Sequence, residues 1–210
     1  VWHTVVWHTV VASVTDRPVK FVFNTHHHGD HTGGNAGLAA AGALIVAHDN
    51  VRVRLADAAA GARPVITFTD AVTFHQNGED IHAFHVANAH TDGDGVVHFR
   101  NTNVIHAGDT FFSGHYPYID IDGGGSVDGL IAAVDRITAL VDGDTRIIPG
   151  HGPLSDADDL RRYRAVLTTC RGRVVSLIAE GKTREEAIAA RPNADYDDEW
   201  GSGFINPERW

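Results

Sequence analysis

The chain has 210 residues and a formal net charge of −10, with 17 Lys and Arg against 27 Asp and Glu. Hydrophobic residues make up 43% and charged residues 21%, a balance typical of a globular protein, and we expect one domain over residues 1–210. The negative charge argues against nucleic acid as a partner, because such binding relies on clustered Lys and Arg. No apolar stretch approaches the roughly 20 residues of a membrane-spanning helix.

The N-terminal segment is a short duplication, because residues 1–5 read VWHTV and residues 6–10 repeat them. Its alternation and β-branched residues predict a strand, so residues 1–16 form an atypical, strand-like N-terminus in which His3 and His8 are not expected to bind metal. The segment lacks the basic and apolar regions of a signal peptide. The sequence as written therefore favours the cytoplasm, whereas a signal peptide removed before residue 1 would place the protein in the periplasm or outside the cell.

A histidine-rich motif follows at residues 25–35, THHHGDHTGGN. The aromatic and β-branched residues 19–24 before it predict a buried strand, and the Gly pair after it allows a turn into a helix over 35–42. Neutral imidazole and carboxylate suit zinc and other borderline divalent metals. A polar surface loop is the plainer interpretation, and it is disfavoured because further potential ligands lie downstream. The motif itself offers four ligands in the pattern H-x-H-x-D-H, namely His26, His28, Asp30 and His31, and we expect His27 to point away from them.

Segments of helical and extended pattern alternate along the rest of the chain, which indicates a mixed α/β fold. Helices are expected over 50–60, after an N-cap at Ser126, after an N-cap at Ser155, and after a capping box formed by Thr183 and Glu186. Strands are expected at 44–47, 65–68, 71–75, 81–87, 96–100, 103–107 and 146–148.

The helix after Ser155 carries both the single cysteine and most of the arginines. Cys170 lies on its apolar stripe, which predicts a buried core thiol, and the lone cysteine excludes an intrachain disulfide. The arginines are expected to form the solvated face of this helix rather than a binding patch. The acidic tail over 195–210 is expected to dock through Trp200, Phe204 and Trp210.

Three further potential ligands lie at the ends of predicted strands or in the loops that follow them. They are His90 in the run AHTDGD, Asp109 in AGDT and His151 in PGHGP. Each has a plainer interpretation as a turn or loop residue, but their shared position at strand ends favours a common site. Asp92 and Asp94 either orient the His90 imidazole or simply form the turn after it.

These four motifs, in this order, resemble the signature of the metallo-β-lactamase-fold superfamily of hydrolases over about residues 17–180. The resemblance implies a four-layer αββα sandwich with metals at one edge, here with an abbreviated N-terminal sheet. It implies two divalent metals per chain, zinc first, with manganese or iron also compatible with ligands that are all nitrogen and oxygen. One metal would be held by His26, His28 and His90, the other by Asp30, His31 and His151, and Asp109 would bridge them.

The resemblance further implies a metal-dependent hydrolase in which hydroxide at a dinuclear site attacks the carbonyl of an ester, lactone, thioester or β-lactam. Asp30 would also orient the hydroxide as a catalytic residue. His115 and Tyr116, shortly after Asp109, are the expected substrate-binding residues for a small acyl molecule. The motifs look similar to those of bacterial hydrolases that are close to the β-lactamases. True β-lactamases carry another residue at the position of Asp109, so β-lactam cleavage is expected to be weak.

The alternative function is a catalytically weak or silent metal-binding scaffold or assembly module, in which the short N-terminal region has truncated the pocket. An unpaired sheet edge near the N-terminus would also invite pairing with another chain. We therefore expect a homo-oligomer formed through that edge.

Overall fold

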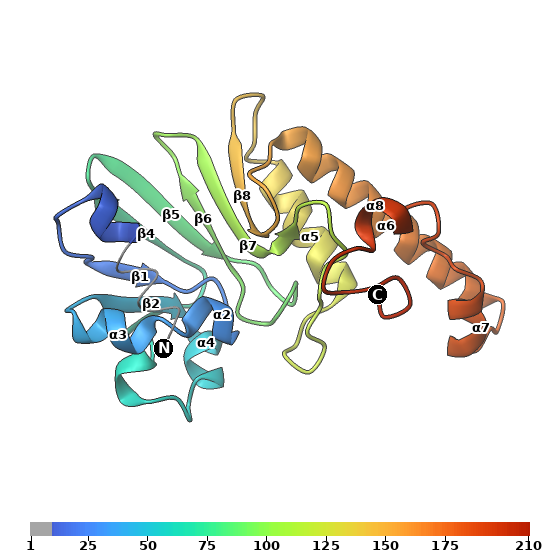
Figure 1. Cartoon of the computed structure of the whole chain (residues 1–210), viewed down its shortest axis with the longest axis horizontal. Coiled ribbons are helices and arrows are strands. Elements are labelled where there is room, and N and C mark those ends of the chain that lie inside the picture. Colours follow the sequence, from blue (N-terminus) through green and yellow to red (C-terminus); the bar gives the residue numbers. More distant parts are fainter. Residues whose placement is uncertain (1–9) are drawn as a thin grey trace.

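The structure, a computed structural model, describes residues 10–210 and contains two β-sheets that face each other (Figure 1). Helices cover the outer face of each sheet, so the layers follow the order αββα. Aromatic side chains join the two sheets, because the rings of Phe21 and Phe74 lie 5.2 Å apart. The predicted sandwich is therefore confirmed. The predicted N-terminal strand over 1–9, with His3 and His8, lies outside the described residues, and residues 10–14 are helical rather than extended.

The first sheet has three short parallel strands, in the order β1-β2-β3. Parallel neighbours need a crossover connection, and short helical segments provide it on one face of the sheet. Its strands are β1 Phe21–Phe23, β2 Leu44–His48 and β3 Ile66–Phe68, and the helical segments are α2 Gly29–Thr32, α3 Asn35–Ala40, α4 Asp49–Arg54 and η1 Ala60–Ala62. The helix expected over 50–60 is thus too long, because the chain leaves α4 after Arg54 and passes through turns into η1.

The second sheet is an antiparallel meander from β4 to β7, closed by β8, which pairs with β7 in parallel. Its strands are β4 Ala71–Gln76, β5 Glu79–His85, β6 Gly95–Phe99, β7 Val104–Phe112 and β8 Arg146–His151. The strand expected over 103–107 is therefore too short. Gly108 interrupts the regular pairing with a φ of +53°, and a Cβ there would lie 2.7 Å from the Thr25 side chain. The strand resumes beyond it as far as Phe112, which carries Asp109 into the sheet.

Two helices cover the outer face of this sheet and complete the main core (Figure 1). They are α5 Val127–Thr138 and α6 Ala157–Ala179, and they are followed by α7 Arg184–Ala189 and α8 Asp197–Trp200. The prediction of a buried Cys170 is confirmed, since its side chain belongs to this core. The arginines of α6 face solvent as predicted, each beside an acidic or carbonyl partner.

The helix caps agree with the predictions except at α6. Ser126 accepts a hydrogen bond from the Gly129 amide, and Thr183 with Glu186 forms the predicted capping box. At α6 the cap is Asp156 rather than Ser155, because the Asp156 carboxylate accepts two amide N–H groups at a position where negative charge is also favoured. The Ser155 hydroxyl instead donates to Ser113 Oγ at 2.8 Å.

The C-terminal tail docks as expected through two of its three aromatic residues. Trp200 is buried in the core, and Trp210 stacks on Tyr116 with ring centroids 4.5 Å apart. Phe204 does not dock, because 80% of its surface stays exposed. Among residues 10–210 we find no helix with both the length and the hydropathy needed to cross a bilayer.

Candidate metal centre

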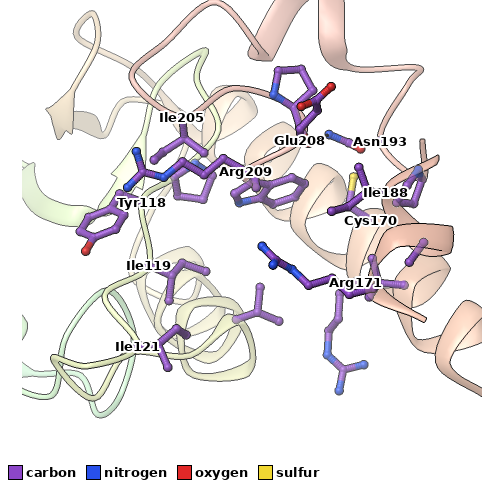
Figure 2. Close-up of a pocket in the computed structure, with 18 of the residues that line it drawn as sticks. Tyr118, Ile119, Ile121, Cys170, Arg171, Ile188, Asn193, Ile205, Glu208 and Arg209 are labelled. Atoms are coloured by element: carbon purple, nitrogen blue, oxygen red, sulfur yellow. Dashed lines mark hydrogen bonds between the residues drawn. The ribbon is translucent and has the colours of Figure 1, made fainter. Parts of the chain in front are cut away.

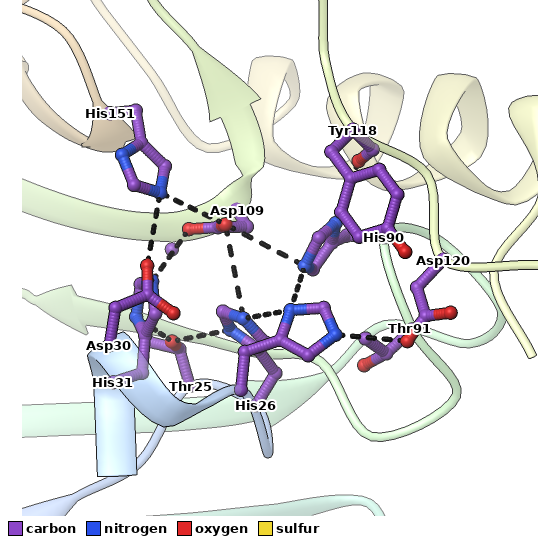
Figure 3. A network of polar contacts seen from close by, with 12 residues as sticks. Thr25, His26, Asp30, His31, His90, Thr91, Asp109, Tyr118, Asp120 and His151 are labelled. Carbon is purple, nitrogen blue, oxygen red and sulfur yellow. Dashed lines mark hydrogen bonds and ion pairs between the residues drawn. The ribbon is translucent and has the colours of Figure 1, made fainter. Parts of the chain in front are cut away.

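The histidine-rich motif forms a tight loop at one edge of the sandwich, where β1 ends and α2 begins (Figure 1), and Figure 3 shows the side chains that gather there. Two side-chain amides close this loop, because Asn24 and Asn35 exchange hydrogen bonds of 3.0 and 2.8 Å. The Thr32 hydroxyl donates to the His28 carbonyl at 3.0 Å. The sequence thus fixes the backbone of the loop with buried hydrogen bonds, so that its imidazoles stand in defined positions.

A first group of ring nitrogens brings His90 to two histidines of the loop. His28 Nδ1 lies 3.1 Å from His26 Nε2 and 3.0 Å from His90 Nε2. His26 and His90 are fully buried, whereas His28 is partly exposed. All three could hold one ion, because their ligand atoms lie within 4.8 Å of one another.

The hydrogen bonds behind these rings show that the site suits a cation. His90 Nδ1 lies 2.7 Å from the Tyr118 carbonyl oxygen, and His28 Nε2 lies 2.9 Å from Asp120 Oδ2. Both nitrogens face acceptors, so we assign the ring protons to them. The opposite nitrogens, His90 Nε2 and His28 Nδ1, then point lone pairs at each other, an arrangement that a cation between them would relieve.

A second group lies beside the first and is more open to solvent. Asp30 Oδ2 lies 3.4 Å from His31 Nε2 and 3.5 Å from His151 Nε2. About half of the Asp30 side chain and 46% of the His151 side chain are exposed. The donor set again fits a borderline divalent metal, and the exposed side leaves room for water or a substrate group, as in catalytic sites.

Asp109 lies between the two groups and contacts both. Its carboxylate oxygens lie 3.1 Å from His31, 3.3 Å from His151, 3.6 Å from His90 and 3.8 Å from His26. The side chain is 5% exposed, and Oδ1 is buried without a well-formed hydrogen bond. A Cβ at Gly150 of β8 would overlap this oxygen, so the glycine makes room for the carboxylate. A buried oxygen of this kind is suited to a cation.

Burial and hydrogen bonding set the protonation of these groups. Burial lowers the pKa of His26 well below its usual range and also lowers the pKa of His90. Burial alone would raise the pKa of Asp109, but the His151 and His31 imidazoles beside the carboxylate lower it far below its usual value. The hydrogen bond to Asp109 raises the pKa of His151. Neutral His26 and His90 beside an ionised Asp109 are the forms that bind metal.

The structure therefore brings all seven predicted metal-site residues together, but it places the two predicted substrate-binding residues elsewhere. Tyr116 is 1% exposed, and its hydroxyl donates to Asn193 and Asp197 beneath the C-terminal tail. His115 lies against Gly203 of the same tail. The chain turns at residues 113–114 after β7 ends, so the short sequence distance to Asp109 does not carry these two residues into the ligand cluster.

The acidic residues after His90 belong to the turn, and the His90 ring is hydrogen-bonded to the Tyr118 carbonyl oxygen instead. Asp94 is buried and accepts hydrogen bonds from the Thr91 amide and hydroxyl, and Asp92 pairs with Arg54.

Three residues around the cluster were not predicted from the sequence, namely Thr25, Tyr118 and Asp120. The Thr25 hydroxyl lies 3.2 Å from His26 Nδ1 and 3.3 Å from His31 Nδ1. No recognised motif contains Tyr118 or Asp120; the only signal is that they alternate with apolar Ile119 and Ile121.

An apolar pocket of about 590 Å³ lies beside the loop that carries Tyr118, between this loop, α6, α7 and the C-terminal tail (Figure 2). Ile119, Ile121 and Ile205 are among its walls. Tyr118 also lines it, and the Tyr118 ring lies 5.8 Å from that of His90 and 5.9 Å from that of His28. Tyr118 thus borders both the pocket and the ligand cluster.

Comparison with known proteins gives consistent matches in sequence. The sequence profile described as the Metallo-beta-lactamase superfamily matches residues 9–153, a range that contains the whole cluster. Hydroxyacylglutathione hydrolase from Polaromonas sp. is 33% identical over 67% of this chain and 51% of its own. The protein of the same name from Pelagibacter ubique is 32% identical over 45% of this chain and 37% of its own. The one from Nitrosococcus oceani is 31% identical over 62% of this chain and 47% of its own. The chain spans about half the length of these curated relatives or less.

A solved structure agrees with the fold. A metallo-beta-lactamase from Pontibacter korlensis superposes with a TM-score of 0.66 at 21% identity, over 76% of this chain and 74% of the other. At this identity the likeness concerns the fold alone.

Proposed function

This chain belongs to the metallo-beta-lactamase superfamily, and from that membership and the geometry of its His/Asp cluster we propose that it is a metal-dependent hydrolase of a small acyl substrate. One observation carries the proposal. The buried carboxylate of Asp109 lies within 3.8 Å of four imidazoles that come from both sides of the sandwich. Two ligand groups around one shared carboxylate are the arrangement that a dinuclear site needs.

We propose two divalent cations per chain, zinc first, with manganese or iron also suited to nitrogen and oxygen ligands. His26, His28 and His90 would hold one, Asp30, His31 and His151 the other, and Asp109 would bridge them. When bound, such cations lower the pKa of a shared water toward neutrality and polarise a carbonyl oxygen.

The chain's own residues then divide the remaining work. Asp30 is the proposed catalytic residue, because its half-exposed carboxylate at the open side of the cluster can accept a hydrogen bond from the attacking water and orient it. The buried imidazoles of His26 and His90 exclude solvent from the inner side. The apolar pocket beside Tyr118 is the proposed place for the part of the substrate that does not react.

Among acyl substrates we propose a thioester first, because three curated relatives carry the name hydroxyacylglutathione hydrolase. Ester, lactone and β-lactam carbonyls would be attacked in the same way, with β-lactam cleavage weak. We also propose that residues 1–210 form a single hydrolase domain, since Trp200 and Ile205 of the tail pack into the same core as β7.

Hydrolysis of a small panel tests this function. The panel contains a 2-hydroxyacyl glutathione thioester, an acyl lactone, an aryl ester and nitrocefin, each assayed before chelation, after chelation and after zinc is restored. We expect the thioester to be hydrolysed fastest, chelation to abolish turnover and zinc to restore it. A fully metal-loaded protein that hydrolyses none of the four above the uncatalysed rate would contradict the proposal and favour the silent scaffold.

A further inference from the structure

Two proposed ligands of the first group, His28 and His90, each make a hydrogen bond to the same short segment through the ring nitrogen on the side away from the cluster. Tyr118 and Asp120 lie in the connection between β7 and α5, and they contact His90 and His28 respectively (Figure 3). The contacts are a backbone carbonyl oxygen at 2.7 Å from His90 Nδ1 and a carboxylate oxygen at 2.9 Å from His28 Nε2. Each contact is made to the ring nitrogen that points away from the cluster.

The carboxylate of Asp120 is itself fixed in place by the backbone around it. Asp120 Oδ1 accepts the Gly123 amide at 2.9 Å, and the Asp120 amide donates to the His90 carbonyl at 3.0 Å. A Cβ at Gly123 would overlap Asp120 Oδ2, so this turn requires glycine there. With 13% of its side chain exposed, Asp120 is held at one position in the site rather than free at the surface.

We propose that Asp120 is a positioning residue for metal binding, which acts by accepting the Nε2–H of His28 and thereby keeps His28 Nδ1 free to face His26 and His90. The inference rests on the proposed function, since it concerns the cation of the first group. A carboxylate behind a ligand imidazole fixes the tautomer and raises the basicity of the ligating nitrogen. The Thr25 hydroxyl lies beside His26 of the first group and His31 of the second. The Asp120 carboxylate, in contrast, is hydrogen-bonded only to His28 among the proposed ligands, so we expect its effect to be confined to the first group.

The same atoms suggest a competing assignment, in which His27, His28 and Asp120 hold a third cation. The geometry disfavours it. His28 Nε2 lies at hydrogen-bonding distance from Asp120, whereas His27 Nε2 is 3.8 Å from the same oxygen. Cations on both nitrogens of His28 would require a fully deprotonated imidazolate, whereas a hydrogen bond needs only the neutral ring.

Zinc titration of the full chain tests the inference, with a chromophoric chelator as competitor so that both binding steps are resolved. The variants are Asp120→Ala, Asp120→Asn and the matched control Asp92→Asn, a nearby loop carboxylate that pairs with Arg54 instead. We expect Asp120→Ala to weaken one binding step by roughly 10- to 100-fold and to leave the other unchanged. Asp120→Asn keeps an acceptor and should lose less, and the control should stay within about twofold.

The tautomer of His28 in the metal-free protein is a second readout, measured by ¹⁵N NMR of the imidazole side chains. We expect the proton on Nε2 in the unsubstituted protein and a mixture of tautomers in Asp120→Ala. A proton on Nδ1, an equal weakening of both steps with a fall in metal-free thermal stability, or a third zinc that Asp120→Ala removes would each overturn the inference. Absence of any zinc binding in the unsubstituted protein would instead refute the proposed function, while the tautomer would still decide the hydrogen bond.

Discussion

At the residue scale, the position of Asp109 is the most constrained in the cluster. Its carboxylate is buried, contacts four imidazoles and occupies space that Gly150 leaves open. Burying an isolated carboxylate is costly, so its environment has to supply opposite charge. The His151 and His31 imidazoles beside the carboxylate hold its pKa far below the usual range, so it is ionised at neutral pH. Its charge is therefore the feature that a substitution should test.

Removing that charge should abolish turnover. We predict that Asp109→Asn and Asp109→Ala each lower the kcat/KM of thioester hydrolysis by roughly 100-fold or more, the scale of losing one preorganised group that stabilises charge. Metal content should fall below two per chain, while the far-ultraviolet circular dichroism of the metal-free protein stays unchanged. Asp142→Asn, in a turn where Asp142 contacts Asn103 and Thr145, is the matched control. A variant that keeps full activity without Asp109 would refute its bridging role.

The sequence indicated the proposed ligands but not the groups that hold them. His26, His28, Asp30 and His31 fall in one short motif, and the structure brings the later three residues to them. The partner of the His90 ring is a backbone carbonyl, which any residue at position 118 would supply, so it leaves no sequence signal. Asp120 is one acid among 27 Asp and Glu, and only the tertiary fold distinguishes it.

At the element scale, patterns identified strands and helices well and failed where a local interaction replaced the pattern. The Gly-Asp pair in the middle of β7 suggests a turn, yet Thr25 packs against Gly108 and the strand continues beyond it. Ser155 and Asp156 are both good N-caps by type. The Ser155 hydroxyl is used by Ser113, a contact across 42 residues that sequence reasoning has no means to foresee.

Loss of the Asp156 cap should destabilise α6. We predict that Asp156→Ala lowers the free energy of unfolding by about 1 kcal/mol, and that Asp156→Asn, which keeps a side-chain oxygen, lowers it by much less. Asp158→Ala in the same turn is the control, since Asp158 is exposed and contacts only Arg161 through its side chain among the described residues. Urea unfolding followed by circular dichroism measures the difference. Equal stability of Asp156→Ala and the control would show that the cap contributes little.

At the scale of the whole molecule, the cluster joins the two sheets. His26, His28 and His31 follow β1 of the first sheet, whereas Asp109 and His151 belong to β7 and β8 of the second. Metal bound there would link both halves of the sandwich, so metal binding and folding should be coupled. The family resemblance supplied this architecture, because periodicity alone indicated only a mixed α/β chain.

The metal-free protein should lose stability on acidification. Burial lowers the pKa of seven histidines, and it lowers that of His27 to about 4. Below pH 6.5 the unfolded chain therefore takes up protons that the folded chain does not. The seven histidines are His26, His27, His48, His82, His90, His98 and His106. The unfolding free energy should therefore fall between about pH 7 and pH 4. Asp94, whose pKa burial raises to about 7, and His151 act in the opposite direction but are fewer.

Urea unfolding in the presence of chelator at pH 7, 6 and 5 measures this dependence. A lower midpoint at pH 5 than at pH 7 is the expected result. An unfolding free energy that is constant or rises toward pH 5 would show that the buried histidines do not control the acid stability.

The edge of the first sheet should support self-association. Within residues 10–210, β1 pairs with β2 alone, and an edge strand without a second neighbour can pair with another chain. We predict a homo-oligomer whose mass by light scattering rises with concentration. A monomeric mass across the whole concentration series would rule this assembly out.

The central claim is a dinuclear centre, and metal content tests it most directly. Protein purified without chelator is analysed by elemental mass spectrometry before and after saturation with zinc and removal of excess ions. The geometry around Asp109 predicts two metals per chain. Less than one metal per chain, not raised by zinc, manganese or iron, would show that the two ligand groups do not assemble and would contradict the proposed site.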